Sequence, residues 1–79
     1  MTIHITNLSP SLIEADLQRL FTPYGEIDAV EIKRDKLNNR SQGSAQIDMP
    51  IEREARNAIS SLNGHSLGGK TLIVSALHF

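Results

Sequence analysis

The chain has 79 residues, 39% of them hydrophobic and 22% charged, which is typical of one small ordered globular domain and excludes a disordered segment. It contains no cysteine, which excludes disulfides, thiolate zinc sites and thiol nucleophiles. Its formal net charge is -1 at pH 7, so the argument for a polyanionic partner has to rest on local charge.

The first half of the chain reads as a strand, a helix and a second strand. Residues 2–8 alternate apolar and polar side chains and are rich in β-branched residues, which predicts a strand with one buried face. Residues 9–11, Ser-Pro-Ser, break the strand and offer hydroxyl groups as helix caps. Apolar residues at helical spacing then predict a helix over about 12–22, and renewed alternation predicts a strand over 27–32.

The second half begins with a polar, turn-prone stretch at 36–42, which predicts a hairpin loop. A third strand is predicted at about 43–49 because its apolar residues alternate. Pro50 is expected in the first turn of a second helix, where its missing N–H group costs nothing. The apolar stripe of this helix runs from Ala55 to Leu62, and Asn63-Gly64 closes it.

The last predicted elements are a turn at Gly68-Gly69 and a β-prone run over 71–77. The order strand, helix, strand, strand, helix, strand predicts an α+β, ferredoxin-like βαββαβ fold over residues 1–79, with both helices on one face of a four-stranded antiparallel sheet. Alternation along the strands leaves the other face open. Its expected residues are His4, Thr6, Glu31, Lys33, Ser44, Gln46, Asp48, Ile73, Ser75 and Leu77.

Two stretches carry a resemblance to a known family. Residues 3–8 read Ile-His-Ile-Thr-Asn-Leu, and residues 42–49 read Gln-Gly-Ser-Ala-Gln-Ile-Asp-Met. They resemble the first-strand hexamer and the third-strand octamer of the RNA-recognition-motif family. Shorter stretches at 16–25, 58–64 and 67–74 also resemble the family, and they occur in the family's order along the chain. The resemblance implies the family's function, the binding of single-stranded RNA on the open face of the sheet.

Members of this family stack bases on aromatic rings, and the matching positions here are His4, Ser44 and Gln46. Since only His4 carries a ring, we expect reduced stacking and binding weaker by roughly 10²-fold or more, at ~1–3 kcal/mol per stacked base. Positive charge can compensate for the lost stacking by binding phosphates. Residues 33–42 hold four cationic side chains and one aspartate, and they flank this face. Phe79 and His78 at the carboxyl end are candidates to fold across the sheet and supply a ring, the alternative being a terminal Phe that is frayed or packed on the core. The predicted RNA-binding residues are His4, Thr6, Lys33, Arg34, Arg40, Ser44, Gln46, Ser75 and Phe79.

No motif in the sequence gives strong support for catalysis. Residues 64–71 match the phosphate-loop pattern G-x-x-x-x-G-K-[ST], but such a loop follows a strand and opens a helix, whereas here a helix precedes it and a strand follows. The histidines have no ligand-spaced partners, and the acidic pairs two residues apart on helices do not share a face. We therefore expect no enzyme activity, no catalytic residue, no metal and no cofactor.

The expected function is that of a cytoplasmic RNA-binding domain within a ribonucleoprotein, with single-stranded DNA as an alternative ligand. We expect no membrane attachment and no small-molecule substrate, and a stand-alone domain rather than one excised from a longer protein. The alternative function is that of a degenerate member of the family, which binds a protein partner or forms a weak homodimer. Ile73 and Leu77 favour this alternative, because they place apolar side chains on the open face.

Overall fold

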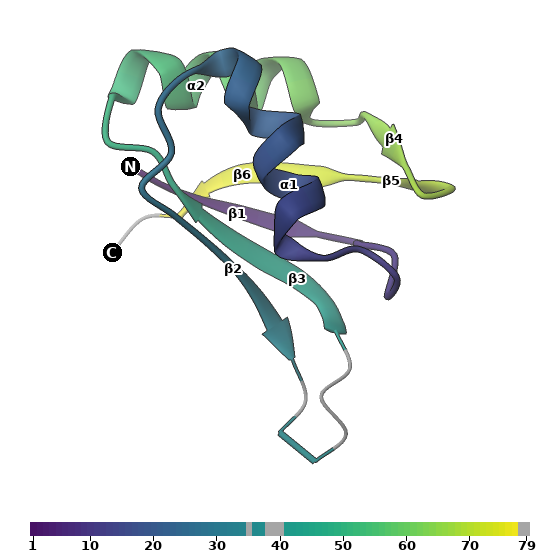
Figure 1. Ribbon diagram of the computed structural model, residues 1–79. Coiled ribbons are helices and arrows are strands. Elements are labelled where there is room, and N and C mark those ends of the chain that lie inside the picture. Colours follow the sequence, from purple (N-terminus) through teal and green to yellow (C-terminus); the bar gives the residue numbers. More distant parts are fainter. Residues whose placement is uncertain (35, 38–40, 78–79) are drawn as a thin grey trace.

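The computed structural model describes residues 1–34, 36–37 and 41–77, and shows two helices layered on one face of a sheet (Figure 1). The description of residues 41 and 42 covers their backbone only. Neither helix in the described part of the chain is long and apolar enough to cross a membrane. The elements in chain order are β1 (Thr2–Thr6), α1 (Glu14–Phe21), a 3-10 turn (Thr22–Tyr24), β2 (Ala29–Arg34), β3 (Ser41–Asp48), α2 (Glu52–Leu62), β4 (Ser66–Leu67), β5 (Lys70–Thr71) and β6 (Ile73–Leu77).

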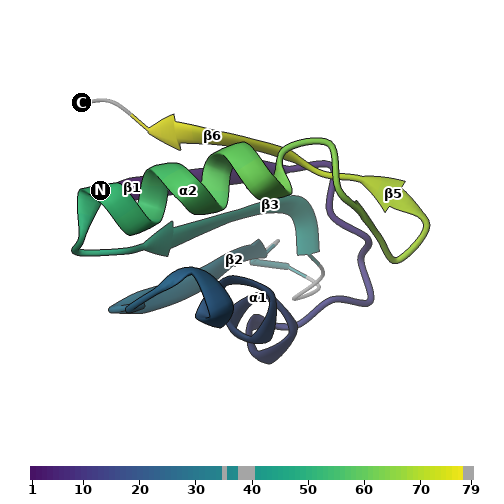
Figure 2. The same cartoon turned by 90° about the horizontal axis from the view of Figure 1, so that it is seen from above.

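The main sheet has the strand order β2-β3-β1-β6, and all neighbouring strands are antiparallel. Figure 2 shows both helices over the same face, with α1 on the β2 side and α2 toward β6. This arrangement confirms the predicted α+β, ferredoxin-like fold. The short β4–β5 hairpin forms a second, separate sheet that the sequence analysis did not predict.

The core lies between the sheet and the helices because alternate strand residues point to the helix side. Ile3 and Ile5 of β1 are fully buried, while His4 between them stays on the other face. The predicted division of the strands into two faces is therefore right. The buried core comprises Ile3, Ile5, Leu8, Leu17, Phe21, Ile32, Ala45, Ile47, Met49, Ala55, Ala58, Leu62, Leu72 and Val74.

The start of α1 differs from the prediction. The backbone N–H of Ile13 donates to the Oδ2 atom of Asp16 at 3.0 Å, so a carboxylate in the first helical turn satisfies an end group of the helix. The predicted hydroxyl caps, Ser9 and Ser11, instead share a hydrogen bond with each other at 3.0 Å. The helix consequently begins at Glu14, two residues later than expected.

Other boundaries also move by two residues, and β2 spans Ala29–Arg34 rather than the predicted 27–32. β3 begins at Ser41, so the end of the predicted hairpin loop belongs to the strand. Residues 36–37 of the loop form a turn, and residues 38–40 lie outside the described part of the chain. Pro50 precedes α2 rather than occupying its first turn, because Ile51 keeps an extended backbone with φ of -96° and ψ of 110°.

The first strand ends earlier than predicted, and the last strand begins later. β1 ends at Thr6 because Asn7 takes a left-handed conformation with φ of 63°. The side chain of Asn7 donates to the carbonyl oxygen of Thr71 at 2.8 Å and so fastens the end of β1 to the β4–β5 hairpin. The last strand is split at Leu72, whose N–H donates to the carbonyl of His65 at 2.8 Å.

Candidate nucleic-acid interface

The uncovered face of the sheet presents its side chains in three rows that cross the strands. The first row lies at the end where β1 begins, the middle row crosses the centre, and the third row lies at the end where β1 finishes. The register between β2 and β3 shifts between Ile32 and Arg34, which places Lys33 beside the third row. From β2 to β6 the rows are Ala29-Asp48-Thr2-Leu77, then Glu31-Gln46-His4-Ser75, then Ser44-Thr6-Ile73.

His4 occupies the centre of the middle row, opposite Gln46 of β3 and Ser75 of β6. Its side chain is half-buried, and its Nδ1 atom has no hydrogen-bond partner among the residues that the structure describes. Gln46 and Ser44 are also half-buried and lie on the strand next to β1. The three positions that matched family stacking sites therefore lie on adjacent strands of one open face, where a planar base has room to lie against the sheet.

The other predicted polar contacts share this face. Thr6 and Ser44 are paired neighbours in the third row, and both are half-buried. Ser75 is exposed in the middle row. Arg40 and Phe79 lie outside the described residues, so their roles remain predictions.

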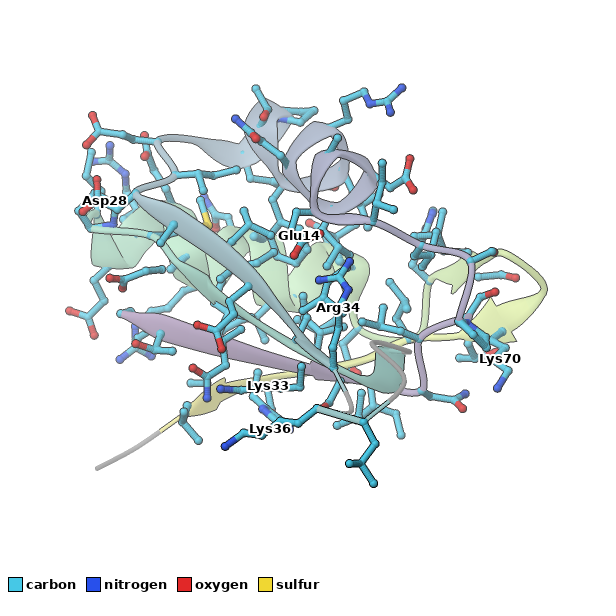
Figure 3. All side chains as sticks on the ribbon, turned by 60° about the horizontal axis from the view of Figure 1, so that its bottom comes forward. Glu14, Asp28, Lys33, Arg34, Lys36 and Lys70 are labelled. Atoms are coloured by element: carbon cyan, nitrogen blue, oxygen red, sulfur yellow. The ribbon has the colours of Figure 1, made fainter. Side chains whose placement is uncertain are left out.

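Charge is separated along the strands. Lys33 lies beside the third row, and Lys36 is exposed in the turn that follows β2 (Figure 3). Lys70 of β5 is exposed at the same end of the sheet, on the β6 side (Figure 3). Acidic side chains lie toward the opposite end, with Glu31 in the middle row and Asp48 in the first row. A polyanion therefore meets its most favourable potential at the end of the face where β2 leads into the turn before β3. We call this the hairpin end of the face.

Glu31 reduces the positive charge of Lys33, because the Nζ atom of Lys33 donates to its Oε1 atom at 2.9 Å. Both side chains are exposed, and such surface pairs contribute little to stability. The pair nevertheless leaves Lys36 and Lys70 as cations for which the described residues show no ion pair. Lys70 was not among the predicted site residues, because only the β4–β5 hairpin brings it to this end of the sheet.

Arg34 lies on the helix-covered side, and its grouping with Lys33 as a phosphate contact does not fit the structure. Its guanidinium donates to both carboxylate oxygens of Glu14, at 2.5 Å and 2.9 Å, and so joins β2 to the first turn of α1 (Figure 3). This bidentate hydrogen bond lowers the pKa of Glu14 to about 2. The reason for the error is alternation, because consecutive strand residues point to opposite faces.

The segment that matches the phosphate-loop letters is a hairpin. It follows α2, and its central glycines, Gly68 and Gly69, have φ of 62° and 80° and form the turn between β4 and β5. Two left-handed residues are what a two-residue hairpin turn requires. The segment opens no helix, so it lacks the helix end that binds phosphate in true phosphate-binding loops.

Sequence comparison finds a family model described as RNA recognition motif, which matches residues 3–73. The protein elav of Drosophila melanogaster is 40% identical over 73 residues, which cover 92% of this chain and 15% of that protein. A component of eukaryotic translation initiation factor 3 from Nematostella vectensis is 43% identical over 63 residues, covering 80% of this chain and 21% of that protein. The chain thus spans a small fraction of the length of these curated relatives.

Solved structures agree with the sequence comparison. The crystal structure of RNA Binding Protein PG1 matches with a TM-score of 0.94 and 34% identity, covering 100% of this chain and 96% of that one. A structure described as a Sxl-lethal protein/RNA complex matches with a TM-score of 0.88 and 34% identity, covering 94% of this chain and 46% of that one. Both likenesses extend over almost the whole chain.

The Glu14–Arg34 pair generates a prediction about stability. Because folding lowers the pKa of Glu14 from 4.5 to about 2, its stabilisation is fully present above about pH 4.5 and is lost as the pH falls toward 2. The Glu14 side chain is 41% exposed, so solvent screening limits the effect, and we expect Glu14→Gln to lower the free energy of unfolding by about 1 kcal/mol at pH 7.

Urea denaturation, monitored by circular dichroism at several pH values, measures the free energy of unfolding of the parent chain and of Glu14→Gln. The gap between the parent chain and Glu14→Gln should close between pH 4.5 and pH 2. A gap that stays constant over this range would contradict the assigned role of the carboxylate.

Proposed function

The chain belongs to the RNA recognition motif family, and we propose that it binds single-stranded RNA on the open face of its sheet. This family consists of binding domains, and the chain is accordingly a binding module rather than an enzyme. The observation that carries the proposal is the placement of His4, Ser44 and Gln46 on adjacent strands of an uncovered face, with Lys33 at its edge.

Stacking at the three family positions is limited to one ring. His4 offers the only aromatic surface at the three family positions, since Ser44 and Gln46 carry none. A stacked base contributes ~1–3 kcal/mol, so two missing rings weaken binding by roughly 10²-fold or more. Ser44 and Gln46 compensate in part, because a hydroxyl and an amide can donate to base edges and accept from them. The proposal is therefore of weak binding with hydrogen-bonded rather than stacked bases.

The phosphates of the RNA are proposed to bind at the hairpin end of the face. Lys33, Lys36 and Lys70 lie there in the described structure. Arg40, four residues after Lys36 in the sequence, is a further proposed phosphate contact. Each phosphate that a cation neutralises on a single strand adds about 0.7 to the slope of log affinity against log salt concentration. Binding should accordingly weaken as salt rises. Phe79 remains a proposed extra ring, and Thr6 and Ser75 are proposed hydrogen-bonding contacts.

The proposed setting is a cytoplasmic ribonucleoprotein. A relative named as part of a translation initiation factor supports this location. Single-stranded DNA is proposed as a second, weaker ligand, because stacking and phosphate contacts do not require the 2′-hydroxyl that distinguishes RNA.

Removing the charge of Lys33 tests the phosphate path. We expect Lys33→Gln to weaken binding of an RNA octamer and to lower the salt slope by about 0.7, because one phosphate contact is lost. Fluorescence anisotropy at several salt concentrations measures both quantities. The matched control is Arg53→Gln, which removes one positive charge from the exposed surface of α2. Equal losses in both variants would mean that only net charge matters.

Changing the rings on the face tests base stacking. We expect His4→Ala to weaken RNA binding by about 5- to 100-fold, since its ring is the one platform at the three family positions. Gln46→Tyr should strengthen binding by a similar factor, because it adds a platform on the next strand. The control Gln18→Tyr adds the same ring to the exposed side of α1. The stacking proposal fails if Gln46→Tyr changes affinity no more than this control does.

A second candidate function is supported by the apolar part of the face. Ile73 is 56% exposed at the β6 edge, and Leu77 is half-buried on the same strand. Exposed apolar side chains on a sheet face are one mark of protein contact, and a second copy of the chain is the simplest partner to test. Sedimentation over a wide concentration range should show a monomer if RNA is the ligand. A mass that rises with concentration, and falls back in Ile73→Asp, would favour dimerisation.

A further inference from the structure

The open face contains a small hollow between its first and middle rows, which we call the acidic hollow. It measures about 180 Å³ and is lined by Thr2, Ala29, Glu31, Gln46 and Asp48. Enclosed small-molecule sites usually measure about 300–1,000 Å³, so this hollow can admit only part of a ligand, such as one base. The space exists because Ala29, with its single methyl group, lies opposite Asp48 in the first row.

The walls of the hollow favour hydrogen-bond donors. Glu31 and Asp48 are carboxylates, which only accept hydrogen bonds when ionised. One oxygen of Glu31 already accepts from Lys33, and its second oxygen remains available. The Asp48 carboxylate takes part in none of the side-chain hydrogen bonds or ion pairs found within the described residues. Gln46 and Thr2 can adapt, because an amide and a hydroxyl both donate and accept.

This environment separates phosphates from bases. The two carboxylates repel phosphate oxygens, whereas Lys36 and Lys70 attract them at the other end of the strands. Lys33 lies between these two regions, because its Nζ atom donates to Glu31. An RNA strand whose backbone runs past the lysines would therefore turn a base, rather than a phosphate, toward the acidic hollow. His4 lies beside Gln46 in the middle row and can support that base from the side.

The four bases differ in the donors they present to a carboxylate. The Watson–Crick edge of guanine has two adjacent donors, N1–H and N2–H, which match the two oxygens of one carboxylate. Adenine and cytosine each present an amino group next to a ring acceptor. Uracil presents one N–H between two carbonyl oxygens, and both of these would face the negative charge.

We propose that the acidic hollow selects guanine and disfavours uracil at one position of the bound strand. Asp48 is assigned the bidentate contact, while Glu31 and Gln46 complete the edge. A divalent cation is a less suitable occupant, because no group of three His, Asp or Glu side chains that could hold a metal is found in the described part of the chain. This inference rests on the proposed RNA-binding function and adds a base preference to it.

Fluorescence anisotropy with three labelled RNA octamers, of alternating AG, AC and AU sequence, tests the preference. We expect the AG octamer to bind about 5- to 100-fold more tightly than the AU octamer, which is the discrimination of one bidentate contact. Asp48→Asn keeps the shape of the side chain but replaces one acceptor oxygen by a donor, and should reduce the AG-to-AU ratio at least about 5-fold. Glu31→Gln provides a second variant, with a smaller expected reduction.

The matched control is Asp28→Asn, which removes the same charge just before β2, outside the residues that line the hollow (Figure 3). It should leave the AG-to-AU ratio unchanged. Equal binding of AG and AU octamers by the parent chain would overturn the inference while leaving RNA binding intact. A preference that survives in both Asp48→Asn and Glu31→Gln would also overturn it. Failure to bind any octamer at low salt would instead overturn the proposed function, and the base preference with it.

Discussion

The two-residue alternation of side chains along four antiparallel strands decides which residues enter the core and which form the open face. Ile3 and Ile5 of β1 are fully buried beneath the helices, and this burial forces His4 to the opposite face. A shift of one residue in register would exchange the two faces and expose the core, so burial fixes the register and with it the composition of the open face. The placement of the candidate RNA contacts is therefore a direct consequence of core packing.

The open face combines few rings with a separation of charge. Among the described residues its ring is His4, at the centre, and Lys36 and Lys70 lie toward the opposite end of the strands from Asp48. Stacking does not distinguish strongly between bases, whereas hydrogen bonds to base edges do. A face that loses rings and gains amide, hydroxyl and carboxylate groups should therefore bind more weakly but discriminate more sharply. The acidic hollow around Asp48 is the proposed place of this discrimination.

The fold and the two faces of the sheet were predictable because they follow from hydrophobic periodicity, which is local in sequence. The pairing of Arg34 with Glu14 was not predicted, because an ion pair across 20 residues depends on how α1 crosses β2. Its side of the sheet could have been inferred, since Arg34 shares the parity of buried Ile32. The acidic hollow depends on cross-strand register and on the small side chain of Ala29, and neither is visible in single-strand patterns.

RNA is proposed to bind the face opposite the helices. An NMR titration of the isotopically labelled chain with a single-stranded RNA octamer tests this placement, because each backbone amide reports its own surroundings. The largest shift changes are expected at His4, Ser44 and Gln46, with the exposed residues of α1 and α2 nearly unchanged. Shift changes that cluster on α1 or α2, with β1 and β3 unaffected, would contradict it.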